Sequence, residues 1–146
     1  MPRESFTASH RLRVRWAEVD QQNIVFNGHY LTYFDVAVTE YWRAIGLPYP
    51  ETIAGTGADL YTVKSTVEYH RSARYDDWLD LFIRCARLGR SSLTFLLEIW
   101  RGDEHLVSGE LIYVNASPQT RRSAPVPDRL REAILGFERV APQQAT

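Results

Sequence analysis

Hydrophobic and basic residues alternate over residues 11–18, near the start of the chain. The apolar members are Leu12, Val14 and Trp16, and the basic members are Arg11, Arg13 and Arg15. Successive side chains of an extended backbone point to opposite faces. The pattern therefore predicts a strand with one buried face and one face in water.

The hydrophobic spacing changes at Asn27, and from there to Gly46 it follows steps of three and four residues. This spacing predicts a helix, which Asn27 is suited to cap and which Gly46, followed by Pro48, is suited to end. Its apolar positions are Tyr30, Leu31, Phe34, Val38, Tyr41, Trp42 and Ile45. Because these positions cover much of the circumference, we expect other structure to enclose the helix.

Four further stretches alternate between apolar and polar residues and predict strands, at 61–70, 79–86, 92–100 and 106–115. The turns expected between them are at Asp76-Asp77, Gly89-Arg90 and Gly102-Asp103. Strands joined mostly by hairpins form an antiparallel sheet. About five strands wrapped around the long helix would bury the apolar sides of both.

This order of elements predicts one α+β domain over residues 1–146, with a core at about 10–137. A short helix at 128–137, with Asp128 as its cap, is expected to end the core. We expect the tail at 140–146 to be flexible. An open sheet leaves an edge strand that a second copy can cover, so we also expect a dimer.

Composition and charge narrow the choice of partners. The formal net charge is −1 and the basic residues are spread along the chain, so we expect no nucleic-acid or membrane partner. No apolar run approaches the roughly 20 residues that span a bilayer, and no secretory signal opens the chain, so a cytoplasmic setting is expected. The single cysteine, Cys85, is interpreted as a small core residue. The histidines His10, His70 and His105 lie too far apart in sequence to indicate a metal site.

Asp20 is the main candidate for chemistry, because it ends the first strand-like stretch seven residues before Asn27. The first turn of a helix has backbone N–H groups without acceptors, and these can stabilise an oxyanion. A carboxylate that faces them can act on an acyl carbon, either as nucleophile or as general base for water. The alternative is that Asp20 closes a turn and Asn27 caps the helix.

The segment around Asp20 resembles the hotdog-fold acyl-CoA thioesterases of the 4-hydroxybenzoyl-CoA thioesterase type. The resemblance rests on Arg13-x-Arg15-Trp16-x-Glu18-x-Asp20-x-x-x-Ile24-Val25-Phe26-Asn27-x-x-Tyr30-Leu31, continuing to Ala37-Val38-Thr39-Glu40. Weaker similarities follow at Tyr69-x-x-Ser72-Ala73, Gly89-Arg90-Ser91-Ser92 and Gly109-Glu110-Leu111, so that it covers roughly residues 10–137. It implies a hotdog fold and hydrolysis of acyl-CoA thioesters to free acid and CoA.

The resemblance also implies roles for particular residues. Asp20 matches the catalytic aspartate, and Asn27 matches the position whose backbone N–H polarises the thioester carbonyl, with the N–H of Gly28 as a second donor. The positions that contact the phosphates or pantetheine of CoA are matched by Arg87, Arg90 and Ser91. CoA enters as part of the substrate, and no metal or redox cofactor is implied. Proteins of this type form dimers that pair into tetramers, with active sites at the subunit interface.

Residues beside the motif are further candidates, each with a plain structural alternative. The aromatic ones can line an acyl or aryl pocket or simply form core; they are Trp16, Phe26 and Tyr30. His29 can orient water or touch the substrate, or it can be a surface residue. Glu40 is a rival catalytic acid, and its alternative is an ion pair with Arg43. For Arg87 and Arg90 the alternative is a solvated turn.

The sequence departs from the resemblance directly after Asp20, where small residues are common and this chain has Gln21, Gln22 and Asn23. Asparagine tolerates a left-handed backbone, so the turn can survive. The glutamines can narrow the pocket, which leaves room for a domain that binds acyl-CoA or acyl-carrier protein without hydrolysis. A hotdog hydratase or dehydratase is the other alternative, but it needs an acid–base histidine, and His29 lies too near the helix start.

Overall fold

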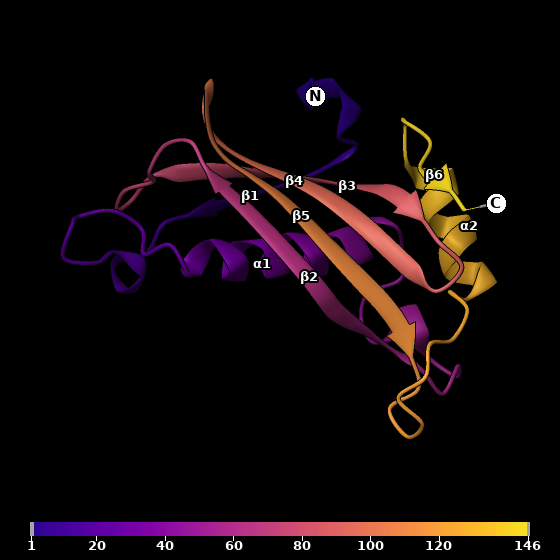
Figure 1. Cartoon of the computed structure of the whole chain (residues 1–146). Coiled ribbons are helices and arrows are strands. Elements are labelled where there is room, and N and C mark those ends of the chain that lie inside the picture. The colour runs from indigo at the N-terminus through magenta and orange to yellow at the C-terminus, as the bar shows by residue number, and fades with distance from the viewer. Residues whose placement is uncertain (1, 146) are drawn as a thin grey trace.

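The computed structural model shows one long helix, α1, lying along one face of an antiparallel sheet (Figure 1). The structure describes residues 2–145. The sheet has the order β1-β3-β4-β5-β2, and a short sixth strand, β6, pairs with β3. The strands are β1 (Ala8–Arg13), β2 (Asp59–Tyr69), β3 (Trp78–Leu88), β4 (Ser92–Arg101), β5 (Glu104–Ala116) and β6 (Gln143–Gln144), and the helices are α1 (His29–Ala44) and α2 (Asp128–Phe137). The predicted arrangement of strands around one long helix is confirmed.

The centre of the sheet is built from hairpins, since β3, β4 and β5 follow one another antiparallel and β2 returns to pair with β5. The turns before β3 and between β4 and β5 need a left-handed backbone, with φ of 67° at Asp76 and 57° at Gly102. The core lies between α1 and the inner face of the sheet. Its largest fully buried side chains include Tyr33, Phe34, Tyr41, Leu79, Leu81, Ile83, Phe95 and Ile99.

α1 approaches the sheet closely at Gly109 in β5. The ring of Phe34 occupies the space that a Cβ atom at position 109 would need. A glycine inside a strand often marks such a close approach of another element. Gly109 therefore sets how deeply the first half of α1 sits on the sheet.

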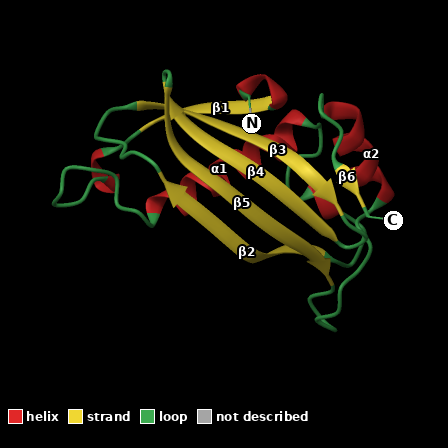
Figure 2. Cartoon of the chain, turned by 45° about the horizontal axis from the view of Figure 1, so that its top comes forward, coloured by secondary structure: helices red, strands yellow, loops and turns green. Residues whose placement is uncertain are grey.

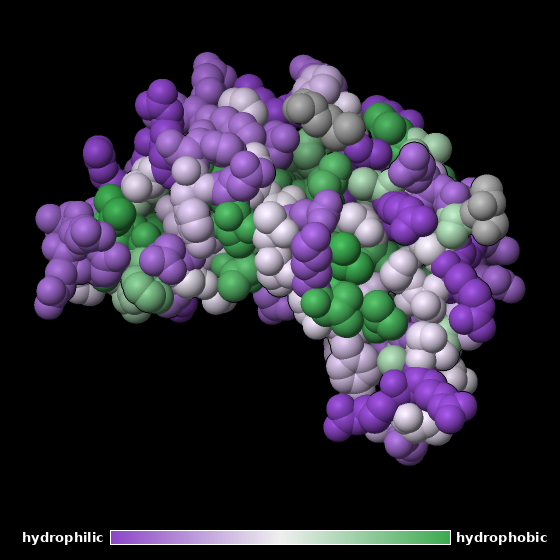
Figure 3. Space-filling view, in the orientation of Figure 1, coloured by the Kyte–Doolittle hydropathy of each residue, from purple (hydrophilic) through white to green (hydrophobic). Residues whose placement is uncertain are grey.

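Among strands β1 to β5, β2 is the least covered. β2 is exposed on both faces over most of its length, including at Tyr61, Val63 and Tyr69. Its outer edge pairs with no other strand within residues 2–145. Figures 1 and 2 show β2 and the end of β5 extending beyond the helix. Figure 3 shows an apolar patch on the outer face of this part of the sheet, where Val63, Val114 and Ala116 line a hollow.

The first strand differs from its prediction. β1 ends at Arg13, and Trp16–Glu18 forms a turn of 3₁₀ helix. The cause is local, because the Glu18 carboxylate accepts a hydrogen bond from the backbone N–H of Arg15 and curls the chain. Trp16 was expected on the buried face with Val14, and that expectation is wrong: its side chain is 73% exposed and packs edge-on against Tyr75.

Both helix starts also differ from expectation. α1 begins at His29, and its cap position is Gly28, not Asn27 as predicted. Among the described residues no side chain forms a hydrogen bond that caps this helix start. α2 has the predicted bounds, but Asp128 is its first residue, and the cap position belongs to Pro127.

The C-terminal segment that we expected to be a flexible tail contains β6. Gln143 and Gln144 lie parallel to Arg87 and Leu88 of β3, and the N–H of Ala145 donates to the carbonyl of Leu88 at 3.0 Å. Residue 146 lies outside the described range. No helix in the described part of the chain combines the length and the apolar character that crossing a membrane requires.

Candidate active site

Asp20 opens a tight loop that returns at Ile24. The N–H of Asp20 donates to the carbonyl of Ile24 at 2.9 Å, and the N–H of Asn23 donates to the carbonyl of Asp20 at 3.0 Å. Asn23 has φ of 62°, which confirms the left-handed backbone expected there. Gln22 closes the turn, because its N–H donates to Oδ1 of the Asp20 carboxylate at 2.8 Å.

The Asp20 carboxylate therefore has one structural oxygen and one free oxygen. Oδ1 holds the turn, while Oδ2 takes part in no hydrogen bond or ion pair with residues 2–145. The side chain is only partly exposed and lines a pocket. The structural and the catalytic interpretations of Asp20 are thus compatible, since each uses a different oxygen.

The start of α1 supplies hydrogen-bond donors beside this carboxylate. The N–H of His29 donates to Phe26 at 2.9 Å and that of Tyr30 to Asn27 at 3.3 Å. Within the described chain, the N–H groups of Asn27 and Gly28 have no acceptor. Free N–H groups at the positive end of a helix favour a negatively charged oxygen.

The pocket has a volume of about 170 Å³ and gathers residues from the Asp20 loop, the start of α1 and the end of β2. It is lined by Asp20, Gln22, Ile24, Val25, Asn27, Tyr30, Tyr69, Arg71 and Ser72. Tyr69 closes one side, since its ring lies 5.6 Å from that of Tyr30 and its hydroxyl donates to the carbonyl of Asn27 at 3.4 Å. The walls are thus aromatic, and the rim is polar.

Three of the predicted site residues meet in this pocket: Asp20, Asn27 and Tyr30. Phe26 and His29 do not line it. Their rings pack on each other at 5.8 Å beside the helix start. Trp16 and Gly28 do not line it either. In the same chain, Arg87 lies near the end of β3, and Arg90 and Ser91 lie in the turn between β3 and β4. Figures 1 and 2 show this turn at the far end of the sheet from the loop before α1.

Three pocket residues had no role in the sequence-based prediction: Tyr69, Arg71 and Ser72. They reach the site because the chain after β2 is pinned to the Asp20 loop. The N–H of Val25 donates to the carbonyl of Ala73 at 2.9 Å, and the N–H of Ala73 donates to the hydroxyl of Tyr30 at 3.0 Å. The stretch Tyr69-x-x-Ser72-Ala73 was a weak sequence signal for this contact.

Glu40 does not belong to the pocket. It forms an ion pair with Arg43 on the next turn of α1, as its structural alternative predicted. Between residues 2 and 145, no three His, Cys, Asp or Glu side chains come together in a way that could hold a metal ion. Asp20 is therefore the acid that this pocket offers for chemistry.

Comparison with known proteins identifies the family. A model of the thioesterase superfamily matches residues 22–108, more than half of the chain. The chain belongs to the thioesterase superfamily. A proposed esterase of Aquifex aeolicus (strain VF5) supports this assignment, with 30% identity over 94 residues, which are 64% of this thioesterase chain and 73% of that protein.

Solved structures resemble this thioesterase over nearly its whole length, which confirms the hotdog fold. A thioesterase of Thermus thermophilus, solved in complex with coenzyme A and zinc, has a TM-score of 0.79 and 26% identity, covering 92% of this chain and 96% of its own. A Pseudomonas aeruginosa PAO1 protein has a TM-score of 0.80 and 25% identity, and the match covers 95% of this chain and 96% of that protein. The family match begins two residues after Asp20, so the evidence on Asp20 is the local geometry.

Proposed function

We propose that this thioesterase hydrolyses acyl-CoA thioesters to the free acid and CoA, with Asp20 as nucleophile or general base. The observation that carries the proposal is a pocket in which a carboxylate with a free oxygen meets Asn27. The N–H of Asn27 and that of the adjacent Gly28 both lack acceptors within the described chain. The N–H groups of Asn27 and Gly28 would receive the oxyanion that forms on the thioester carbonyl.

Two routes fit this geometry. In the first, Oδ2 of Asp20 attacks the carbonyl carbon, the C–S bond breaks, and CoA leaves as a thiolate that takes up a proton. Water then opens the mixed anhydride and restores the carboxylate. In the second, Asp20 takes a proton from a water molecule as that water attacks the same carbon, and CoA again leaves as the thiol.

CoA as the leaving group is supported by the relative from Thermus thermophilus, whose structure contains coenzyme A. In this chain Arg71 lies at the pocket rim with an exposed side chain, 3.6 Å from Glu104, and a guanidinium group suits phosphate oxygens. Arg87, Arg90 and Ser91 remain candidates for CoA contact, but they would reach the Asp20 pocket of a second copy. The Asp20 pocket of their own chain lies at the other end of the sheet.

A dimer would bring these parts together. Two β2 strands paired antiparallel across a twofold axis would place the first residues of one β2 beside the last residues of the other. The β3–β4 turn lies level with the start of β2, since Ser92 and Tyr61 both pair with Val114. The partner's β3–β4 turn would therefore lie level with the pocket at Tyr69. The apolar hollow on the outer face is a second surface, suited to joining two dimers into a tetramer.

Thiol release from a panel of acyl- and aroyl-CoA thioesters tests the proposal. We expect Asp20→Asn to lower the rate at least about 100-fold, because an essential acid–base group is lost. Asp103→Asn is the matched control, since it removes the charge of a fully exposed turn aspartate that pairs only loosely with Arg3. Equal rates for wild type and Asp20→Asn would rule out Asp20 as the catalyst.

One observation favours a second candidate function, binding without turnover. Gln22 lines the pocket where small residues are common in the family it resembles, and it can crowd the position of an attacking water. Binding of acyl-CoA with no thiol release would establish this alternative. A hydratase is not supported, since none of the residues described as lining the pocket is a histidine.

A further inference from the structure

Glu18 is a buried carboxylate for which the chemistry of Asp20 has no direct use. It is 6% exposed and lies two residues before Asp20. Its Oε1 accepts hydrogen bonds from the N–H of Arg15 at 2.8 Å and from the hydroxyl of Tyr33 at 2.9 Å. Its Oε2 accepts from Nε and Nη2 of the Arg15 guanidinium at 3.2 and 3.1 Å. Such complete bonding is what makes a buried charge tolerable.

These bonds connect the pieces of chain that carry the site. The backbone carbonyl of Glu18 accepts the N–H of Phe26, the residue before Asn27, at 3.0 Å. The next residue, Val19, forms an antiparallel bridge with Val25, which closes the base of the Asp20 loop. Tyr33 lies one turn into α1. Glu18 is therefore joined to both arms of the loop and to the helix whose start supplies the N–H donors.

We infer that Glu18 is a positioning residue, which fixes the Asp20 carboxylate relative to the free N–H groups of Asn27 and Gly28. The inference rests on the proposed hydrolysis by Asp20. Glu18 does not line the pocket, so it acts only through the backbone and through Tyr33. Attack on a carbonyl depends on near-contact geometry, and a displacement of about 1 Å can cost about 100-fold in rate.

The same helix carries a matched control pair. Tyr41 is as deeply buried as Tyr33 and donates its hydroxyl proton to another buried carboxylate, Glu138, at 2.8 Å. Glu138 follows α2 and also accepts the N–H of Cys85 in β3. Neither of these hydrogen bonds of Glu138 leads to the Asp20 loop. Tyr33→Phe and Tyr41→Phe thus remove the same group from the same kind of bond, and only one of the two bonds leads to the site.

The experiment measures kcat, KM and melting temperature for both variants, together with the hydrogen exchange of the loop amides of Asp20, Asn23 and Phe26. We expect similar losses of melting temperature. Tyr33→Phe should lower kcat about 10-fold with KM within about twofold of wild type, and Glu18→Gln should lower kcat about 100-fold. Loop amides should exchange faster in these two variants, while Tyr41→Phe should keep the wild-type kcat and loop exchange.

Two results would overturn the inference. One is wild-type kcat and wild-type loop exchange in Tyr33→Phe. The other is an equal loss in Tyr33→Phe and Tyr41→Phe, which would make the effect one of general stability. If Glu18→Gln does not fold, the two tyrosine variants decide alone. Failure of the proposed hydrolysis is a separate outcome, because wild type would then release no thiol, while loop exchange would still report on Glu18.

Discussion

The two tyrosine–glutamate pairs of α1 look alike but differ in charge balance. Burial raises the pKa of both carboxyl groups. At Glu18 the bonds from the Arg15 N–H, the Tyr33 hydroxyl and the Arg15 guanidinium together outweigh burial, so the pKa lies below its ordinary value. At Glu138 the bonds from Cys85 and Tyr41 offset burial only in part, so the pKa is raised.

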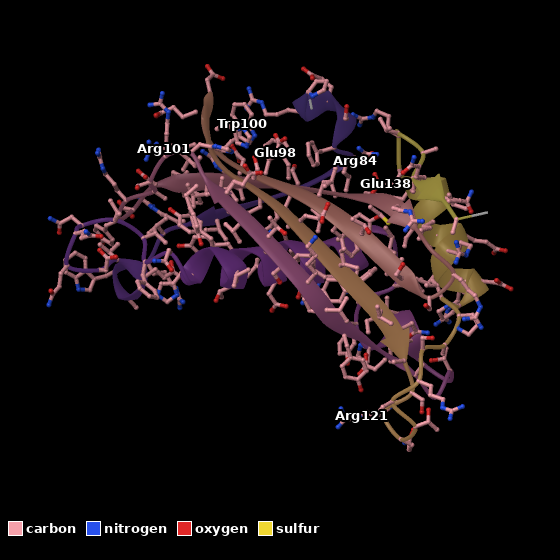
Figure 4. The ribbon with its side chains drawn as sticks, viewed as in Figure 1. Arg84, Glu98, Trp100, Arg101, Arg121 and Glu138 are labelled. Atoms are coloured by element: carbon pink, nitrogen blue, oxygen red, sulfur yellow. The ribbon has the colours of Figure 1, made fainter. Side chains whose placement is uncertain are left out.

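The two carboxylates also differ in how an arginine acts on them. Arg15 donates directly to Glu18, through two nitrogens and its own backbone N–H. Figure 4 shows Glu138 near the end of β3, with Arg84 in its neighbourhood. Burial raises the pKa of Glu138 more than the charge of Arg84 lowers it. A buried carboxylate therefore stays ionised where its donors and its cation together outweigh burial, as they do at Glu18.

Of the substitutions that distinguish the Glu18–Tyr33 pair from the Glu138–Tyr41 pair, Gly109→Ala should have the largest effect on stability. The new Cβ would overlap the ring of Phe34, which is the residue after Tyr33, and would push the site half of α1 away from the sheet. We expect a loss of about 2–3 kcal/mol in the free energy of unfolding, measured by urea titration. In the control Gly136→Ala, the Cβ meets no atom of the described chain within 4 Å, and the variant should be as stable as wild type or more so. Equal stability of the two variants would contradict the close approach at Gly109.

Glu18→Gln should have the next largest effect. The amide of the new glutamine would point its N–H groups at the N–H donors of Arg15. We therefore expect the free energy of unfolding at pH 7 to fall by about 2 kcal/mol. The folded-state pKa of Glu18 is lowered, so its ionisation stabilises the fold above the unfolded pKa of about 4.5, and this contribution is lost as the pH falls through the folded-state pKa. The difference in the free energy of unfolding between variant and wild type should therefore become smaller below pH 4.5. A gap that stays constant with pH would show that the charge of Glu18 does not matter.

Glu138→Gln should have the smallest effect, with the opposite sign of pH dependence. The folded-state pKa of Glu138 is raised, so wild type loses stability as the pH rises from about 4.5 through that pKa. The amide keeps an oxygen for Tyr41 and Cys85 and cannot ionise. We expect the variant to be at least as stable as wild type at pH 7, with no advantage below pH 4.5, in urea titrations across this range. A lower stability at pH 7 would show that ionised Glu138 is favourable.

The sequence predicted the parts of the fold that depend on local pattern. Alternation placed β2 to β5 within a few residues of their bounds, and the spacing of Tyr30, Phe34 and Tyr41 identified the enclosed helix. It also placed Asp20 and Asn27 in one site, because the loop between them is short and Asn23 suits its left-handed turn.

The rest depended on contacts that sequence spacing does not reveal. Trp16 continues the alternation of β1, but the Glu18 carboxylate curls the chain before it. Tyr69, Arg71 and Ser72 enter the pocket through bonds to residues more than 40 positions earlier, such as Ala73 to Tyr30. The burial of Glu18 could not be predicted from the sequence either, because its hydrogen-bond partner Tyr33 lies on another element.

The strand order has a consequence for how the chain is made. Within residues 2–145, β1 pairs with β3 alone, and strands β2 to β5, which form the rest of the sheet over α1, follow α1 in the sequence, from Asp59 to Ala116. During synthesis from the N-terminus, α1 is therefore complete while most of its cover does not yet exist. Such exposed apolar surface on a nascent chain invites chaperone binding or aggregation. The segment that carries Asp20 reaches its final shape only after Ala73 and β3 have been made.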